Sequence, residues 1–153
     1  MDNVSNTEPR EILRRALRVA QELQSLQQEQ QQLEDTLSSL QSFDYQRPIV
    51  KSSGGRGSVE QVAIQVADKK ARIAEQIGKL LAAKDAARKV IDLLPEGPER
   101  TVLIHRYILL GSWEQIAVDL GYSYRHVLRL HGWALRDLDD RWHCMSHDTC
   151  GMV

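Results

Sequence analysis

With 153 residues, 42% of them apolar and 27% charged, the chain is long enough for one ordinary domain or for one small domain joined to an extended element. It has no run of about 18 apolar residues and no basic segment followed by an apolar one at its start, which excludes a spanning helix and a secretory signal and predicts a cytoplasmic protein that uses no membrane. The formal net charge of −1 excludes a protein that coats nucleic acid by bulk attraction, so any DNA binding must come from local charge.

Residues 1–42 are predicted to form a first coiled-coil helix. Pro9 suits a helix start, because its missing N–H would have no partner there. The apolar residues that follow are separated by alternating steps of four and three, which is the heptad spacing of a coiled coil. The positions at this spacing are Ile12, Ala16, Val19, Leu23, Leu26, Gln30, Leu33, Leu37 and Leu40.

One position of this heptad series, Gln30, is polar. A buried amide in a coiled coil costs stability but fixes the register or the number of strands, so we expect Gln30 to influence the pairing. The neighbouring glutamines are interpreted as a solvated helix face, since the leucines keep their spacing throughout.

Residues 43–58 are predicted to form a flexible loop, because the segment contains Pro48 and three glycines and lacks the alternation of a strand. Its cations Lys51 and Arg56 are interpreted as solvated linker charge.

Residues 59–94 are predicted to form a second coiled-coil helix. Lys69 and Lys84 interrupt its apolar stripe, and the step from Ile73 to Ile77 shifts the phase. Two long amphipathic helices joined by such a loop can fold back as an antiparallel hairpin, and a homodimer through the first helix is the alternative. The stripe consists of Val59, Val62, Val66, Ile73, Ile77, Leu80, Ala87, Ile91 and Leu94.

Pro95, Gly97 and Pro98 end this helix and mark the predicted domain boundary. After it, residues 98–142 are predicted to form a three-helix domain of the helix-turn-helix type. Its first helix would end at Gly111. The second would begin with a Ser112 cap, completed by Gln115 as a capping box, and the third would begin after Ser123.

The helix-turn-helix prediction depends on a set of packing residues at fixed positions. Ala117 is small where the next helix would cross, and Gly121 can take the left-handed backbone angle of a tight turn. Val127 would pack the third helix against the second. The other residues predicted to point inward are Val102, Leu103, Ile104, Tyr107, Ile116, Leu120, Tyr122 and Leu130, and Trp113 and Trp133 are expected in the core where the helices meet.

The outward face at the start of the third helix is predicted to contact DNA. Arginine forms bidentate hydrogen bonds with guanine, so Arg125 and Arg129 are the candidates for base recognition. The free N–H groups and the dipole of a helix start favour phosphate, which places Ser123 and Tyr124 at the DNA backbone. No acidic residue interrupts this face. The candidate DNA-binding residues are Ser123, Tyr124, Arg125, His126, Leu128, Arg129 and Arg136.

Structural roles compete with this interpretation. Arg125 and Arg129 would also suit a solvated face that pairs with carboxylates such as Asp119, and Tyr124 would suit packing. Histidines on helices are often surface or packing residues, so His126 and His131 remain open between the two roles.

Residues 94–138 resemble the fourth conserved region of bacterial primary sigma factors. That region combines an arginine- and leucine-rich helix, a glycine, a short helix, a leucine-glycine turn and a recognition helix that ends in alanine-leucine. The matching residues are Arg106, Tyr107, Gly111, Ile116, Ala117, Leu120, Gly121, Ser123, Val127, Ala134 and Leu135.

The whole layout, with GYSYRHVLRLHGWAL after a glutamine- and leucine-rich hairpin, resembles a small family from phages and prophages of Gram-positive bacteria, akin to ArpU-type late transcription regulators. The resemblance implies promoter or operator binding beside RNA polymerase, with Tyr124, Arg125, His126 and Arg129 at positions that contact DNA in sigma factors. Leu128 departs from the polar or basic residue often found in sigma factors, so no promoter specificity carries over. The sigma region that melts the promoter is also missing.

The tail, residues 143–153, is predicted to be disordered. His143, Cys144, His147 and Cys150 are zinc-type ligands, but their spacing matches no standard zinc finger and a frayed terminus fits better. A bridge between the two cysteines would close only a short loop, so no structural disulfide and no metal are expected. No catalytic constellation or cofactor motif is found, so the chain is not expected to be an enzyme.

The sequence therefore predicts an all-α protein: a long helical hairpin followed by a sigma-like helix-turn-helix, acting as a DNA-binding transcriptional regulator. The predicted partner is double-stranded DNA, with RNA polymerase and a homodimer as further candidates. Two alternatives stay open. A small terminase-like DNA-packaging subunit would form a ring of many copies, and a protein–protein module would show no salt-sensitive DNA binding.

Overall fold

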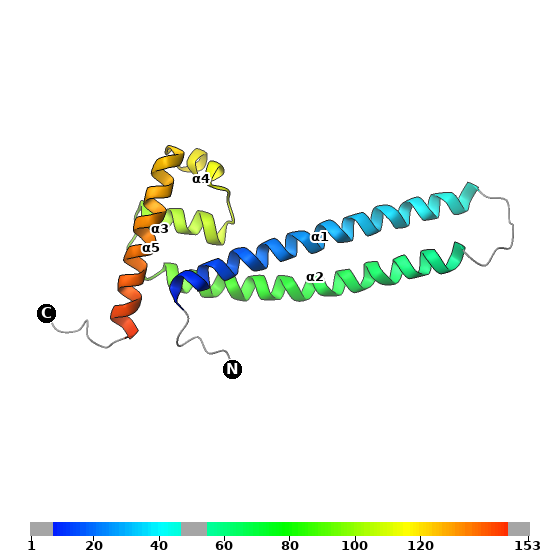
Figure 1. Ribbon diagram of the computed structural model, residues 1–153, viewed down its shortest axis with the longest axis horizontal. Coiled ribbons are helices and arrows are strands. Elements are labelled where there is room, and N and C mark those ends of the chain that lie inside the picture. The colour runs from blue at the N-terminus through cyan, green and yellow to red at the C-terminus, as the bar shows by residue number, and fades with distance from the viewer. Residues whose placement is uncertain (1–7, 47–54, 147–153) are drawn as a thin grey trace. The chain divides into compact units, whose positions relative to one another are not determined.

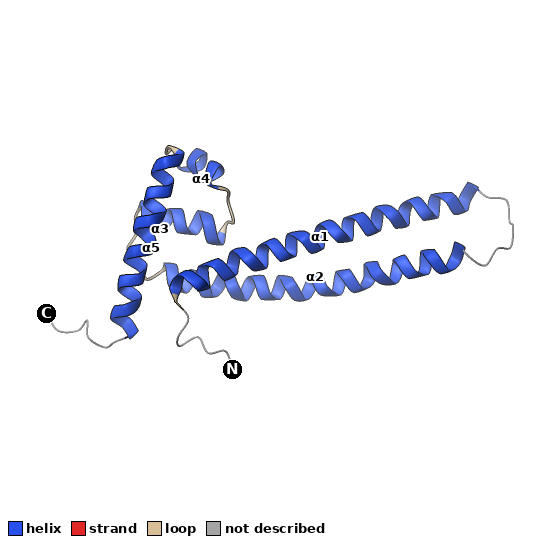
Figure 2. Cartoon of the chain, in the orientation of Figure 1, coloured by secondary structure: helices blue, strands red, loops and turns tan. Residues whose placement is uncertain are grey.

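The computed structural model describes residues 8–46 and 55–146, and every regular element within these two ranges is helical (Figures 1 and 2). The predicted all-α class is therefore confirmed. None of the described helices is long and apolar enough to cross a membrane. The elements are α1 (Pro9–Gln46), α2 (Gly55–Ile91), α3 (Pro98–Leu103), the π-helical turn η2 (Ile104–Ile108), α4 (Trp113–Leu120) and α5 (Tyr124–Ser146).

The two long helices extend further toward each other in sequence than predicted. α1 continues to Gln46 and α2 begins at Gly55, so helix occupies both ends of the predicted loop 43–58. Residues 47–54 of that loop lie outside the described residues. The first turn of α2 contains Gly55 and Gly57, so a helix forms there although glycine has a low intrinsic helix propensity.

The chain divides into two compact units, and the division does not coincide with Pro95 and Gly97. One unit is Gln21–Lys79, and the other combines Met1–Ala20 with Leu80–Val153. Both long helices therefore cross from one unit to the other. The physical reason is a shared core, because the first turns of α1 and the last turns of α2 pack with the C-terminal helices.

The core of the unit that contains both ends of the chain is formed by five helical elements. Leu13 from α1, Ile91 from α2 and Leu138 from α5 have no exposed surface. At its edge, Arg10 and Asp139 form an ion pair of 2.7 Å between the two ends of the sequence. The buried cluster consists of Ile12, Leu13, Ala16, Ala83, Ala87, Val90, Ile91, Leu94, Leu103, Tyr107, Ala134 and Leu138.

A second, smaller core in the same unit joins α3, α4 and α5. Ile116 and Val127 are fully buried in it, and Ala117 is 9% exposed, as expected for a small residue at a helix crossing. The cluster is completed by Val102 and Leu130, with Trp113 and Leu120 partly buried against it.

In the other unit, the two helices run antiparallel and are joined by polar contacts. Lys69 contacts Glu29, and Lys70 lies 3.7 Å from Glu34. The predicted leucines of α1 in this unit are half-buried, while most of the residues between them are exposed. The surface between the two helices therefore buries little apolar area and is partly polar.

At one point of contact between these two helices, the buried residue of α2 is not the predicted one. Gln76 is buried and donates a hydrogen bond of 2.8 Å to Glu22, whereas Ile77 is 41% exposed. The predicted phase shift of the α2 stripe at Ile77 is therefore wrong. The buried series continues through Gln76 at regular helical spacing, and a buried amide is tolerated because it is hydrogen-bonded.

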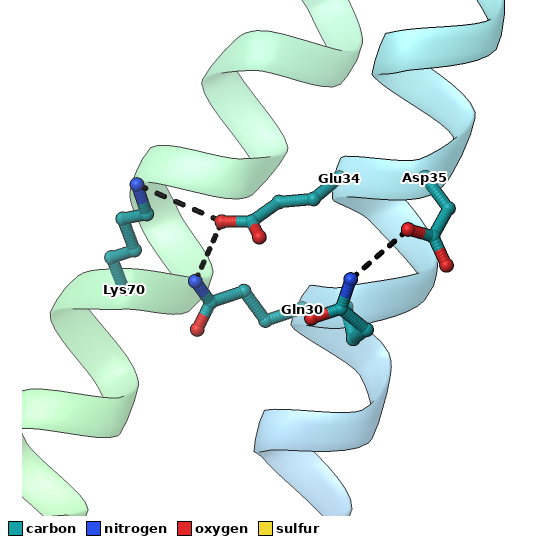
Figure 3. A network of polar contacts seen from close by, with 5 residues as sticks. Gln30, Glu34, Asp35 and Lys70 are labelled. Carbon is teal, nitrogen blue, oxygen red and sulfur yellow. Dashed lines mark hydrogen bonds and ion pairs between the residues drawn. The ribbon is translucent and has the colours of Figure 1, made fainter.

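The polar residue of the α1 series, Gln30, is half-buried. Its amide donates to Glu34 at 2.8 Å, and Glu34 in turn faces Lys70 of α2 (Figure 3). At the next residue of α1, Gln31 donates to Asp35 at 3.0 Å. Gln30 thus reaches α2 through a shared carboxylate, which makes it part of an interhelical polar network.

Candidate nucleic-acid interface

α4 and α5 are joined by a tight turn with defined caps at each side. The hydroxyl of Ser112 accepts a hydrogen bond from the Gln115 N–H at the start of α4. Gly121 ends α4 with the left-handed angles φ 68° and ψ 28°. The hydroxyl of Ser123 then accepts from the His126 N–H at 3.2 Å and starts α5. The sequence predicted all three of these roles correctly.

The second half of the predicted capping box does not form. The side chain of Gln115 donates to Asp119 at 2.7 Å and does not return to Ser112. Asp119 lies one turn along the same helix, and its carboxylate accepts a charge-assisted hydrogen bond from the Gln115 amide nitrogen, whereas the capping box would need the amide oxygen to accept from the Ser112 N–H.

The inward face of α5 fixes the orientation of its outward face. Val127, Leu130, Ala134 and Leu138 are buried at steps of three and four residues. Since these residues bind α5 to the rest of the unit, positions 124, 125, 128 and 129 must point to solvent. All four of these residues are exposed.

The arginines of this outward face form no ion pair with any described residue. Arg125, Arg129 and Arg136 are exposed, and neither a hydrogen bond nor a ring contact engages them within the described part of the chain. Asp119 does not pair with the first two as the competing interpretation required. It accepts from Gln115 and lies 4.0 Å from His105.

The remaining candidates at the start of α5 divide into exposed and packed residues. Tyr124 is 46% exposed and Leu128 38% exposed. His126 is half-buried, with its ring edge-on to Tyr122 at 5.0 Å between ring centroids. Tyr122 itself is 39% exposed, which corrects the expectation that it points inward. The two rings cover each other beside the turn.

Trp133 was expected in the core and is 48% exposed. It lies four residues after Arg129 and three before Arg136, so the three side chains share one helix face. The helical spacing from Arg125 through Arg129 to Trp133 was the signal that could have placed it there. Trp113, in contrast, is half-buried against the smaller core, as expected.

His131 lies in the interior and not on the outward face. Its Nε2 is 2.8 Å from the Tyr107 hydroxyl, and its ring stacks on Tyr107 and meets the Trp113 ring edge-on at 4.7 Å. Burial lowers the pKa of His131 to about 4, with further lowering by the positive charges of Arg106 and Arg10. Burial also raises the pKa of Tyr107. A protonated phenol and a neutral imidazole therefore share this hydrogen bond at neutral pH.

Arg106 contacts the segment that connects η2 to α4 and the first residue of α4. Its guanidinium lies 4.5 Å from the centre of the Trp113 ring and donates to the Gly111 carbonyl at 2.9 Å. The helix ends before the predicted Gly111, since α3 passes into η2 and Leu110 adopts a positive φ of 60°. Gly111 instead allows a close approach of two backbone segments, because a Cβ there would lie in tight contact, 3.3 Å from the His105 carbonyl oxygen.

The tail residues do not assemble a metal site within the described range. No group of three or more potential ligands occurs among the described residues. Cys144 is disulfide-bonded, which corrects the expectation of no disulfide and removes its thiolate as a ligand. His143 is exposed on α5, and His147 and Cys150 lie outside the described residues.

No family profile, no curated protein and no solved structure matches this chain. The resemblance to sigma factors and to phage regulators therefore stays a prediction.

Proposed function

We propose that α4, residues 121–123 and α5 form a helix-turn-helix that recognises a site in duplex DNA, and that the chain regulates transcription from that site. In this proposal α1 and α2 form a helical hairpin, and the protein is a sigma-like regulator of phage or prophage type that acts beside RNA polymerase. The residue pattern at 94–138 supports the assignment to transcription.

The observation that carries the proposal is the state of Arg125 and Arg129. Both side chains are exposed on the first two turns of α5, and both lack an ion-pair partner among the described residues. Meanwhile Val127 and Leu130 hold the opposite face in the core. An unpaired arginine pair on a firmly anchored helix start suits bidentate recognition of guanine, which supports the proposal.

The surrounding residues provide contacts to the DNA backbone. The start of α5 presents free N–H groups and the positive end of the helix dipole beside Ser123 and Tyr124, which favours phosphate. Arg136, two turns beyond Arg129, adds a positive charge suited to an adjacent phosphate. Leu128 is suited to contact with a thymine methyl group.

The test is selection of genomic DNA fragments by the purified protein, followed by fluorescence anisotropy on the selected site in a salt series. We expect Arg125→Ala and Arg129→Ala each to cost about 1–3 kcal/mol on that site and less on random DNA. Arg72→Ala is the matched control, because Arg72 is an exposed arginine of α2 without an ion pair among the described residues.

The salt series separates the two kinds of contact. Loss of a phosphate contact at Arg136 should reduce the slope of log K against log salt concentration by about 0.9 and weaken all DNA equally. If no fragment is enriched and the Arg125 and Arg129 variants bind as the wild type does, the DNA proposal fails. Binding that does not respond to salt would point to a protein–protein module.

A further inference from the structure

α2 carries a second stripe of small and apolar residues on the face that points away from α1. Its members follow each other at alternating steps of three and four, which is heptad spacing. Ile64 is 62% exposed, and the others are exposed as well. The residues that face α1, Val66, Ile73 and Gln76, lie on the opposite side of the helix. We call this stripe the outer face of α2; it consists of Ile64, Ala67, Ala71, Ala74 and Gly78.

The contacts of the described residues do not explain why position 78 is a glycine. A Cβ at this position would have no heavy atom within 4 Å, so nothing in the fold requires a glycine. A glycine inside a helix is less favourable than an alanine at the same position. A missing side chain in this position allows the close approach of a second helix, as do the three alanines that precede it.

The unit Gln21–Lys79 has little core of its own. Among its residues whose side chains are described, only Val66, Ile73 and Gln76 are buried. Two helices in contact can bury only one face each, and stable helical assemblies usually bury more apolar surface than such a pair provides. The exposed isoleucines Ile64 and Ile77 are available for a further contact.

The charges beside the outer face select the partner and its orientation. Lys70 and Glu75 flank the stripe on opposite sides, and in a parallel pair of identical helices Lys70 lies beside Glu75 of the partner subunit, twice by symmetry. In an antiparallel pair Asp68 would instead lie beside Glu75 of the partner subunit, which brings like charges together. The present partners of Lys70 and Glu75 are exposed ion pairs of 3.7 Å to Glu34 and 3.5 Å to Lys79, which contribute little.

We propose that the outer face of α2 binds the same face of a second copy of this chain in parallel orientation. This surface differs from the first-helix coiled coil considered from sequence, because the apolar positions of α1 in this unit already face α2. The inference goes beyond the proposed function and is tested without DNA, so its failure leaves the DNA proposal standing.

Charge reversal tests both the surface and the orientation, with dissociation constants measured by sedimentation velocity over a concentration series. We expect the wild type to form dimers, Glu75→Lys to weaken them about tenfold by placing it against Lys70 of the partner subunit, and Lys70→Glu with Glu75→Lys to restore them. Arg72→Glu, a charge reversal off the outer face, is the matched control and should leave dimerisation unchanged. Because all these side chains are exposed, the monomer fold should persist, which circular dichroism checks.

Single cysteines give an independent readout of the orientation. In a background with Cys144 and Cys150 replaced by serine, Ala71→Cys should form an intermolecular disulfide on mild oxidation, since parallel pairing aligns each position with itself. Gln65→Cys, exposed but off the outer face, should not. A wild type that stays monomeric throughout the series overturns the proposal. Stronger dimers of Glu75→Lys overturn it too, because they would indicate antiparallel pairing through Asp68.

Discussion

The imidazole of His131 is held between the rings of Tyr107 and Trp113 and shares a hydrogen bond of 2.8 Å with the Tyr107 hydroxyl. Its pKa in the folded protein, about 4, lies below its usual 6.5, so the unfolded chain takes up this proton first as the pH falls. The stability that depends on neutral His131 is therefore fully present above pH 6.5 and is lost between pH 6.5 and 4. We expect a loss on the order of 1–2 kcal/mol, reduced by the partial solvent exposure of the ring.

The measurement is urea unfolding at a series of pH values for the wild type and for His131→Gln, whose side chain does not titrate. All other titrating groups are common to both proteins, so the difference between the two curves isolates His131. If both proteins lose stability equally between pH 6.5 and 4, the histidine is not held neutral in the interior.

At the scale of single helices, the turn between α4 and α5 depends on the left-handed backbone of Gly121. An alanine at this angle is strained even though its Cβ would meet no atom within 4 Å. We expect Gly121→Ala to lower the free energy of unfolding by about 1 kcal/mol.

Gly132 is the matched control for this substitution. It lies inside α5, where a Cβ also has free space, and its backbone is helical. Gly132→Ala should therefore stabilise the protein by about 0.5–1 kcal/mol, opposite in sign to the change at Gly121. Urea midpoints of the two variants check the pair, and equal shifts for both would contradict the assigned turn geometry.

At the scale of the molecule, the two ends of the sequence share one core, and Leu13 contributes a fully buried side chain to it. Leu13→Ala should cost about 2–5 kcal/mol, since it leaves a cavity among packed residues. Leu109→Ala should cost less than about 0.5 kcal/mol, because Leu109 is 62% exposed in the same unit.

Tryptophan fluorescence makes this test specific. All three tryptophans lie between residues 113 and 142, far from Leu13 in sequence. If the C-terminal helices formed an independent domain that begins at residue 98, Leu13→Ala would leave the tryptophan transition unchanged. A shift of that transition to lower urea is the expected result of a shared core.

Local features of this protein were set by the sequence alone. Heptad spacing predicted the half-buried leucines of α1, and residue type at Ser112, Gly121 and Ser123 predicted the caps and the turn. These features depend on neighbours within one or two helical turns, where spacing and backbone preference act directly. The separation of Val127 from Arg125 on opposite faces of α5 follows from the same periodicity.

Only the tertiary structure decided which of two similar residues is buried and where the units divide. Gln76 is buried and Ile77 exposed because Glu22 of α1 supplies a hydrogen-bond partner at that layer. Trp133 is exposed because none of the described helices covers that side of α5, whereas Trp113 is covered by Arg106 and His131. Each of these outcomes depends on contacts between residues far apart along the chain, which spacing within a single helix does not encode.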